Sequence, residues 1–320
     1  MENTVTKEGR VNGPTVVTHP LSPEDAAVMT AIRATVAPGK GKMQGTAARE
    51  PFDGIMEQVS PPEGVTFSPD TVGGISGLWC KPSNFRSGEA ILHLHGGWFN
   101  WGTAQAYRHL VGHIAARTGV EAFVPDYKLA PENPFPAAVY DVQACYRGLV
   151  KRGRQRIAIS GDSAGGTLAL VLLSLAVTSG DMAPVGAVAL SPVTDLALTG
   201  PSFDTKADAD PYFTRPQAEG LVRAYLGDAD PKNPLASPLY GNSAGLPPIR
   251  IHVGEDEVLL DDSRRYFERA AAVGIDVQLD VWKGMAHGFA NGVGKLAAAD
   301  QALDSVAAFL AERLTATRGI

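Results

Sequence analysis

The stretch RIAISGDSAGGTLALVLLSL, residues 156–175, decides how this chain folds. A short run with alternating isoleucines leads into Gly-Asp-Ser-Ala-Gly at 161–165, and an apolar helical pattern follows at once. The pattern Gly-x-Ser-x-Gly is weak alone, but between a strand and a helix its glycines permit a tight turn that lifts the serine hydroxyl above a sheet. The stretch therefore predicts a strand, a sharp turn with Ser163 as a nucleophile, and a helix.

Strand and helix patterns alternate along most of the chain. Such alternation predicts an α/β fold with a mostly parallel central sheet and helices on both faces. Expected strands are 65–67, 75–80, 90–95, 120–126, 156–162, 185–192, 249–254 and 276–282, and expected helices are 103–117, 137–151, 164–178, 262–272 and 297–314.

Two segments depart from this alternation. The first fifty residues hold helical patterns at 22–35 and 47–56 and read as an arm or lid part rather than core, while 194–246 holds one amphipathic helix, 215–226. Together they predict a cap over the carboxyl ends of the strands, where open α/β sheets bind ligands. The expected division is an N-terminal arm or cap part (1–56), a first core part (57–195), a cap insertion (196–235) and a second core part (236–320).

Composition excludes several classes of function. The chain has 320 residues and a formal net charge of -6, without the basic stripe that nucleic acid binding needs. No run approaches the roughly 20 apolar residues of a membrane-spanning helix, and Met1 to Gly13 lacks the apolar stretch of a secretory signal, so we expect a cytoplasmic protein with no membrane partner. The two cysteines, Cys80 and Cys145, have no Cys-x-x-Cys spacing and are expected to be buried, reduced thiols.

A serine hydroxyl becomes a useful nucleophile only when a base removes its proton during attack. The segment GMAHGF places His287 after an expected strand and before the last helix, flanked by glycines, and the order serine, acid, histidine fits a catalytic triad. Of the other histidines, His19 lies in the arm and His93 and His252 lie inside expected strands. His109 and His113 lie on one face of an expected helix.

The loop in LHLHGGWFNWG, residues 92–102, follows a strand directly and is rich in glycine. Backbone N–H groups in such a loop can face a reacting carbonyl and stabilise the oxyanion. Together with the N–H of Ala164 at the helix start, we expect backbone N–H groups of this loop to form an oxyanion hole.

The order of motifs resembles one known family. HGGW, DYKLAPENPFPA, GDSAGG, SPVTDL, LASPL, GLPP and AHGF follow the pattern of the bacterial hormone-sensitive-lipase-like (family IV) esterases from about residue 90 to the C terminus. The resemblance implies an α/β-hydrolase fold with a helical cap, a serine carboxylesterase that prefers short acyl chains, and no cofactor. It also implies that the N–H groups of Gly97 and Trp98 are the loop's oxyanion donors, with Gly96 giving the loop its shape. By the same resemblance, His95 braces the loop rather than transferring protons.

One departure from the family pattern falls in this loop. The family usually has His-Gly-Gly-Gly, whereas the third glycine position here is Trp98. Tryptophan keeps the backbone N–H, so catalysis can survive. The added indole is expected to narrow the acyl or alcohol pocket and to disfavour bulky or tertiary-alcohol esters.

The third triad member is expected in HVGEDEVLLDDS, residues 252–263, after the strand that follows the cap. Asp261 and Asp262 stand at the start of a helix and are expected to cap it, and no loop with spaced oxygen ligands for a metal is present. Aspartate is the commoner triad acid, which favours Asp256. The family pattern laid on the chain without a gap favours Glu257, because it keeps a leucine two positions on and an acid four positions on.

The sequence thus predicts ester hydrolysis by Ser163, His287 and Glu257, with Asp256 as the alternative acid. The expected partner is a small-molecule ester, and a homodimer through an edge strand is expected by analogy alone. Hydrolysis of a lactone, an amide or an acetylated natural product is the alternative within enzymes. A non-catalytic binding protein, as in the plant gibberellin receptors of similar fold, is the alternative from another class.

Overall fold

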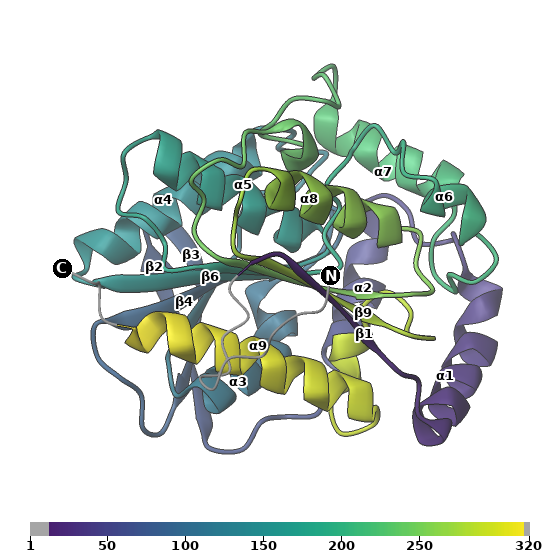
Figure 1. Cartoon of the computed structure of the whole chain (residues 1–320), viewed down its shortest axis with the longest axis horizontal. Helices are drawn as coiled ribbons and strands as arrows, with labels where there is room; N and C mark the ends of the chain where they lie inside the picture. Colours follow the sequence, from purple (N-terminus) through teal and green to yellow (C-terminus); the bar gives the residue numbers. More distant parts are fainter. Residues whose placement is uncertain (1–12, 317–320) are drawn as a thin grey trace.

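A nine-stranded sheet crosses the part of the chain that the computed structural model describes, residues 13–316 (Figure 1). The strand order is β1-β9-β8-β7-β6-β4-β5-β3-β2, and only the β2–β3 and β3–β5 pairs are antiparallel. The expected α/β fold with a mostly parallel sheet is confirmed. The strands are β1 (Thr15–His19), β2 (Val65–Val72), β3 (Ile75–Pro82), β4 (Glu89–Leu94), β5 (Ala122–Pro125), β6 (Arg156–Asp162), β7 (Ala187–Leu190), β8 (Ile249–Gly254) and β9 (Val277–Trp282).

Helices cover both faces of this sheet. In Figure 1, α3 and α9 lie on one face, and α4, α5 and α8 lie on the other. The helices are α1 (Pro23–Val36), α2 (Arg49–Met56), α3 (Ala104–Thr118), α4 (Ala137–Lys151), α5 (Ala164–Thr178), α6 (Ser202–Thr205), α7 (Arg215–Leu226), α8 (Leu260–Ala272) and α9 (Ala297–Thr315), with 3₁₀ turns η1 (Ala37–Gly39), η2 (Thr46–Ala48), η3 (Pro238–Tyr240) and η4 (Phe289–Gly292).

The central elements are apolar because they are covered on both sides. Every residue of β5 and of β7 is buried. Helix α5 packs against β6 and β7, and most of its side chains are buried around its whole circumference. Continuous apolar strands of this kind are what a parallel sheet between two helical layers requires. Ser163 therefore sits between two rigid elements of the core.

Strand β1 corrects the expectation for the arm. Residues 15–19 belong to the sheet rather than to a lid, since β1 pairs in parallel with β9 from Thr15 opposite Gln278 to His19 opposite Trp282. The His19 ring stacks on the Trp282 ring with centroids 3.7 Å apart, and His19 Nε2 lies 2.7 Å from Asp280 Oδ1. These contacts attach residues 15–19 to the edge of the sheet.

The rest of the arm and the insertion between β7 and β8 meet each other. The Gly41 N–H donates to the Tyr212 carbonyl at 3.0 Å, and Gln217 Nε2 donates to the Met43 carbonyl at 2.8 Å. Helix α7 has the bounds expected from its amphipathic pattern, while the short helix α6 was not expected. The division of the chain into arm, core parts and cap insertion stays a prediction.

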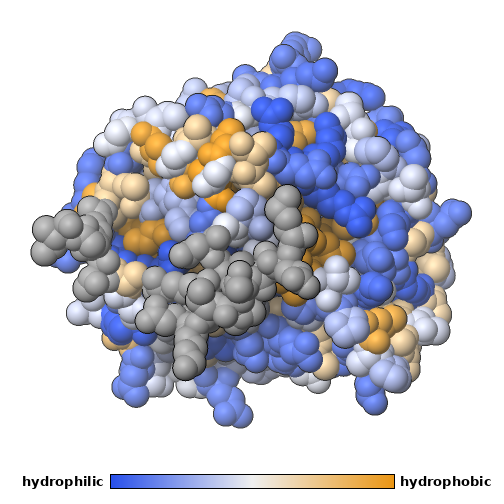
Figure 2. All heavy atoms as spheres, viewed as in Figure 1, coloured by the Kyte–Doolittle hydropathy of each residue, from blue (hydrophilic) through white to orange (hydrophobic). Residues whose placement is uncertain are grey.

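The surface is mostly polar on the face shown in Figure 2, where apolar side chains form separate small groups. None of the helices within residues 13–316 combines the length and apolarity needed to cross a membrane. Cys80 and Cys145 are buried free thiols, as expected, and burial raises the pKa of each to about 12.

Candidate active site

Ser163 occupies the tight turn between β6 and α5. Its backbone has φ 52° and ψ -122°, a conformation that costs a non-glycine residue roughly 1–3 kcal/mol and persists only where the surroundings enforce it. A Cβ on Gly165 would lie 1.9 Å from the Leu94 carbonyl oxygen, and one on Gly161 would lie 2.3 Å from the Gly165 carbonyl oxygen. Only glycine fits at either position, which explains both glycines of the motif in physical terms.

The loop after β4 lies beside this turn. Gly97 and Trp98 both have positive φ, 110° and 53°. Among residues 13–316, the backbone N–H groups of Gly97 and Trp98 have no bonded acceptor, and the Ala164 N–H is in the first turn of α5, where no intrahelical acceptor exists. The three amides that the sequence nominated as oxyanion donors are thus available.

Asp162 holds the loop in place. Its Oδ1 accepts the Gly96 N–H at 3.0 Å, and its Oδ2 accepts the Tyr107 hydroxyl at 3.0 Å. The Gly96 amide is therefore engaged and shapes the loop instead of facing a substrate. A Cβ on Gly96 would lie 2.4 Å from Asp162 Oδ2, so a side chain here would displace the carboxylate that holds the loop.

His95 lies beneath the loop and is fully buried. Its ring stacks on Tyr127 with centroids 4.2 Å apart, its carbonyl accepts the Tyr127 hydroxyl at 2.7 Å, and its Nδ1 lies 2.8 Å from the Gly96 carbonyl. Burial lowers the pKa of His95, which keeps the ring neutral. These contacts suit a residue that braces the loop.

His287 follows β9 and faces the loop between β8 and α8, residues 255–259, which we call the acid loop. Its Nδ1 lies 2.7 Å from Glu257 Oε2. The other oxygen, Glu257 Oε1, accepts the Ser191 hydroxyl at 2.7 Å and the Gly254 N–H at 2.5 Å. Glu257 is fully buried, so these three contacts fix its carboxylate in one orientation.

The surroundings of His287 favour its protonated form. Burial alone lowers the pKa of His287, but the charge and hydrogen bond of Glu257, together with the charges of Asp210 and Asp162, outweigh burial and raise it. A histidine that must accept a proton from serine needs such stabilisation of its cation.

Asp256 points away from His287. Its Oδ2 lies 2.9 Å from Arg33 Nη2 of α1, and its Oδ1 lies 3.4 Å from Lys206 Nζ of the insertion. Both of its oxygens are thus engaged with cations, and it joins the arm and the insertion to the acid loop. Between the two candidate acids, the geometry brings Glu257 to the histidine.

A small pocket lies beside the serine. Its lining includes Ser163, Ser191 and His287, together with residues of η4. Nearby, the Trp98 ring meets the Phe213 ring edge-on with centroids 5.4 Å apart, and Phe213 in turn meets His287 edge-on at 5.0 Å. The phenyl ring of the insertion thus packs against His287, and the indole packs against that phenyl ring.

The sequence reasoning missed three residues of this site. Ser191 lies within the quoted motif SPVTDL, which was a signal for the family but not for contact with Glu257. Asp210 accepts the N–H groups of Tyr212 and Phe213 at 2.8 and 3.0 Å and the Val258 N–H at 2.9 Å, and so ties the insertion to the acid loop. No local pattern marks Asp210 or Phe213, because their roles depend on contacts between distant segments.

The two acids at the start of α8 also differ from expectation. Asp261 and Asp262 lie in its first turn, but their carboxylates bond to the segment after β7 rather than capping their own helix. Within residues 13–316, no group of three or more histidine, cysteine, aspartate or glutamate residues is arranged to hold a metal ion.

Comparison with known proteins identifies the family. A model of the α/β hydrolase fold family matches residues 91–291. The chain is 37% identical to an acetyl-hydrolase of Streptomyces hygroscopicus over 68% of this chain and 73% of that protein, and 32% identical to an esterase of Acinetobacter venetianus over 87% and 93%. It also matches the crystal structure of an esterase from the bacterial hormone-sensitive lipase family, with a TM-score of 0.86, 35% identity, and 92% of this chain and 100% of that chain covered.

The matched proteins are ester hydrolases, and the geometry around Ser163 is suited to the same reaction. The alignment with the Acinetobacter esterase covers most of both proteins. The fold match with the bacterial esterase likewise extends well beyond the sequence motifs. The chain belongs to the hormone-sensitive-lipase-like (family IV) carboxylesterases of the α/β-hydrolase superfamily, and it is a carboxylic ester hydrolase.

Proposed function

We propose that this ester hydrolase is a serine carboxylesterase for short-acyl esters of small molecules, acting through Ser163, His287 and Glu257 and an acyl-enzyme. The observation that carries the proposal is the 2.7 Å contact between His287 Nδ1 and Glu257 Oε2 at a pocket that Ser163 also lines. A buried carboxylate at Nδ1 orients the imidazole and leaves Nε2 for the serine proton.

The steps follow from these positions. Ser163 Oγ attacks the ester carbonyl while His287 Nε2 takes its proton, and the N–H groups of Gly97, Trp98 and Ala164 stabilise the oxyanion. His287 then protonates the leaving alcohol, and the acyl group stays on Ser163. Water attacks this acyl-enzyme, giving its proton to His287, and the acid is released as Ser163 is restored.

The preference for short acyl chains has two supports. The Phe213 ring packs against His287, and the Trp98 ring packs against Phe213, so two large aromatic side chains lie beside the proposed catalytic histidine. One relative at 37% identity is named an acetyl-hydrolase, which is the shortest common acyl class. Lactones, amides and acetylated natural products are substrates that the same residues could hydrolyse, and a non-catalytic binding role is disfavoured because both Ser163 and His287 are present.

The test is turnover of p-nitrophenyl esters from acetate to laurate, combined with labelling by an organophosphate. We expect the highest kcat/KM for acetate or butyrate, and a single label on Ser163 that is absent in Ser163→Ala. Turnover without a label on Ser163 would contradict the mechanism. A preference for the longest acyl chains would contradict the proposed substrate class. Absence of both turnover and labelling would favour the non-catalytic binding role.

A further inference from the structure

Polar contacts join the segment that leaves β7 to the segment that leaves β8. The two strands are parallel neighbours, so residues 191–202 and 254–262 continue from the same edge of the sheet. The first contact is within the candidate triad, where the Ser191 hydroxyl donates to Glu257 Oε1 at 2.7 Å. Ser191 has φ 47°, a strained value for serine that needs support from its surroundings.

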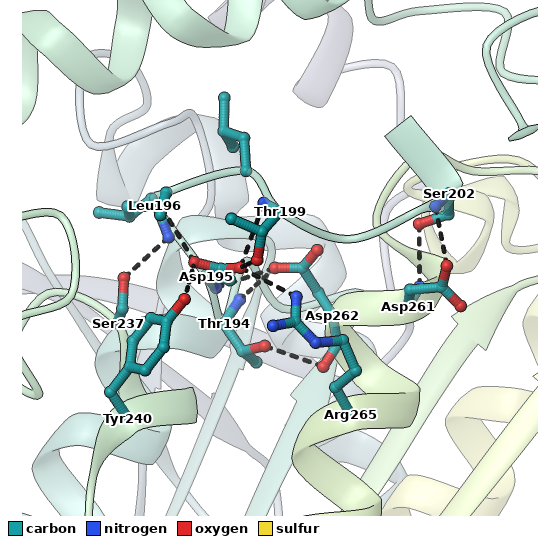
Figure 3. Close-up of polar contacts among 12 residues, drawn as sticks. Thr194, Asp195, Leu196, Thr199, Ser202, Ser237, Tyr240, Asp261, Asp262 and Arg265 are labelled. Atoms are coloured by element: carbon teal, nitrogen blue, oxygen red, sulfur yellow. Dashed lines mark hydrogen bonds and ion pairs between the residues drawn. The ribbon is translucent and has the colours of Figure 1, made fainter. Parts of the chain in front are cut away.

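Asp262, five residues after Glu257, holds the backbone shortly beyond Ser191. Its Oδ1 accepts the backbone N–H groups of Thr194 at 2.8 Å and of Asp195 at 2.9 Å (Figure 3). The Thr194 hydroxyl returns a hydrogen bond to the Asp262 carbonyl at 2.8 Å. Asp262 is fully buried, so solvent cannot replace these bonds.

A third group of contacts lies farther from the triad. The Ser202 N–H donates to Asp261 Oδ2 at 2.7 Å, the Asp261 N–H donates to Ser202 Oγ at 3.0 Å, and the Ser202 hydroxyl donates to the Val258 carbonyl at 2.6 Å. Figure 3 shows Ser202 and Asp261 facing each other at the side of the Asp262 contacts. The first turn of α8 is thus attached to the start of the insertion at two points.

Asp195 extends the attachment to the end of the insertion. Its Oδ1 accepts the Tyr240 hydroxyl of η3 at 3.0 Å, and its Oδ2 lies 2.9 Å from Arg265 Nη1 of α8 (Figure 3). Thr199 also donates to Asp195 Oδ2 from its N–H at 3.2 Å and from its hydroxyl. Asp195, to which the sequence assigned no role, accepts enough bonds to remain charged.

The two neighbouring carboxyls differ in protonation. Burial acts to raise the pKa of Asp195, but bonds from Thr199, Arg265, Tyr240 and Ala197 outweigh it, so the pKa is lowered. Burial raises the pKa of Asp262 to about 8, against the bonds that it accepts from the amides of Asp195 and Thr194. The raised pKa favours the protonated, neutral form of Asp262, which an asparagine side chain imitates.

We propose that Asp262 is a positioning residue for Glu257. By holding the amides of Thr194 and Asp195, it fixes the strained Ser191 where the Ser191 hydroxyl keeps Glu257 directed at His287. The inference rests on the proposed triad and adds to it a residue that does not touch the substrate.

The experiment measures kcat, KM and the pH profile with p-nitrophenyl butyrate in Asp262→Ala, Asp262→Asn, Ser191→Ala and the Asp262→Ala/Ser191→Ala double variant. We expect Asp262→Ala to lower kcat about tenfold with little change in KM, the effect of weakening the Ser191 hydrogen bond to the charged Glu257. Asp262→Asn, whose amide oxygen can accept the same N–H groups, should keep kcat. Because Glu257 raises the pKa of His287, the acidic limb of the profile should move to lower pH in Asp262→Ala.

The double variant tests whether Asp262 affects kcat through Ser191. If Asp262 acts through Ser191, the double variant loses no more kcat than the worse single variant. Glu268→Gln, an exposed site on the same helix, is the matched control and should change nothing. If Asp262→Ala does not fold by circular dichroism, Asp262→Glu, which moves the carboxyl by one methylene, replaces it with the same expectation.

Two results would overturn the inference: unchanged kcat in folded Asp262→Ala or Asp262→Glu, or losses that multiply in the double variant. Glu257→Gln, measured alongside, separates this failure from failure of the proposed function. Full activity in Glu257→Gln would contradict the proposed triad itself. Loss of activity in Glu257→Gln with unchanged activity in the Asp262 variants would contradict only the positioning role.

Discussion

At the scale of single residues, neighbouring positions of like chemistry have unlike surroundings. Asp256 and Glu257 are adjacent acids, yet Asp256 contacts Arg33 and Lys206 while Glu257 contacts His287. The difference follows from burial, because Glu257 is fully buried and its oxygens meet donors from three segments, whereas Asp256 remains half-buried beside two cations. A buried charge without such partners would be costly, so the position of Glu257 depends on all of them.

The departure at Trp98 gives a prediction for substrate range. Trp98→Gly removes the indole at a position whose φ of 53° suits glycine, and Phe213→Ala removes the ring that packs against it. We expect each variant to raise kcat/KM for bulky or tertiary-alcohol esters, relative to p-nitrophenyl acetate, by about tenfold. Phe85→Ala, at an exposed phenylalanine, is the control and should leave the ratio unchanged. An unchanged substrate range in both Trp98→Gly and Phe213→Ala would show that these rings do not limit the pocket.

At the scale of elements, the sequence predicted what depends on local pattern. The strand-turn-helix at residues 156–178 was predictable because the isoleucine alternation, the glycines and the apolar helix are contiguous. Strand β1 was not, because TVVTH is short and half exposed, and its partner β9 lies more than 250 positions along the chain. Its membership of the sheet is decided by tertiary contacts such as the stacking of His19 on Trp282.

The same distinction between local pattern and tertiary contact explains which site residues the sequence indicated. Position and order pointed to His287, the leucine register favoured Glu257 over Asp256, and the structure brings these two side chains, His287 and Glu257, into contact. The Ser191 contact, the Asp210 link and the Asp262 bonds depend on which side chains face one another across neighbouring loops. Linear spacing carries no information about that approach, so the sequence expectation for Asp261 and Asp262, capping of their own helix, was wrong about their partners.

At the scale of the whole molecule, one sheet organises arm, insertion and site. Strands β1 and β2 are its two edges within the described chain, so a homodimer through an edge strand, which stays a prediction, would use one of them. The insertion and the arm both reach the acid loop, through Lys206, Asp210 and Arg33. Stability of the fold and order of the site are therefore linked.

The buried Asp262, which joins the segments after β7 and β8, gives a prediction for how stability depends on pH. The folded pKa of Asp262, about 8, lies above its unfolded value near 4, so the folded protein holds a proton that the unfolded chain has lost, and stability falls as pH rises between these values. Asp262→Asn cannot ionise and escapes this fall. The free energy of unfolding of Asp262→Asn, relative to wild type, should therefore increase from pH 5 to pH 8 by one to several kcal/mol, as an order-of-magnitude estimate, and then level off.

Urea unfolding at pH 5, 6, 7, 8 and 9 measures this difference, and Glu268→Gln serves as the control for loss of one acid from α8. A difference between Asp262→Asn and wild type that is constant with pH, or that shrinks toward pH 8, would contradict a protonated, buried Asp262.

The central claim is that Glu257, and not Asp256, completes a triad with Ser163 and His287. The most direct measurement is kcat for p-nitrophenyl acetate in Glu257→Gln and Asp256→Asn, with folding of both verified by circular dichroism. Loss of the carboxylate that orients a catalytic histidine lowers kcat by roughly 10⁴-fold, so we predict that loss in Glu257→Gln and a change of no more than about tenfold in Asp256→Asn. A 10⁴-fold loss in Asp256→Asn together with an active Glu257→Gln would contradict the account.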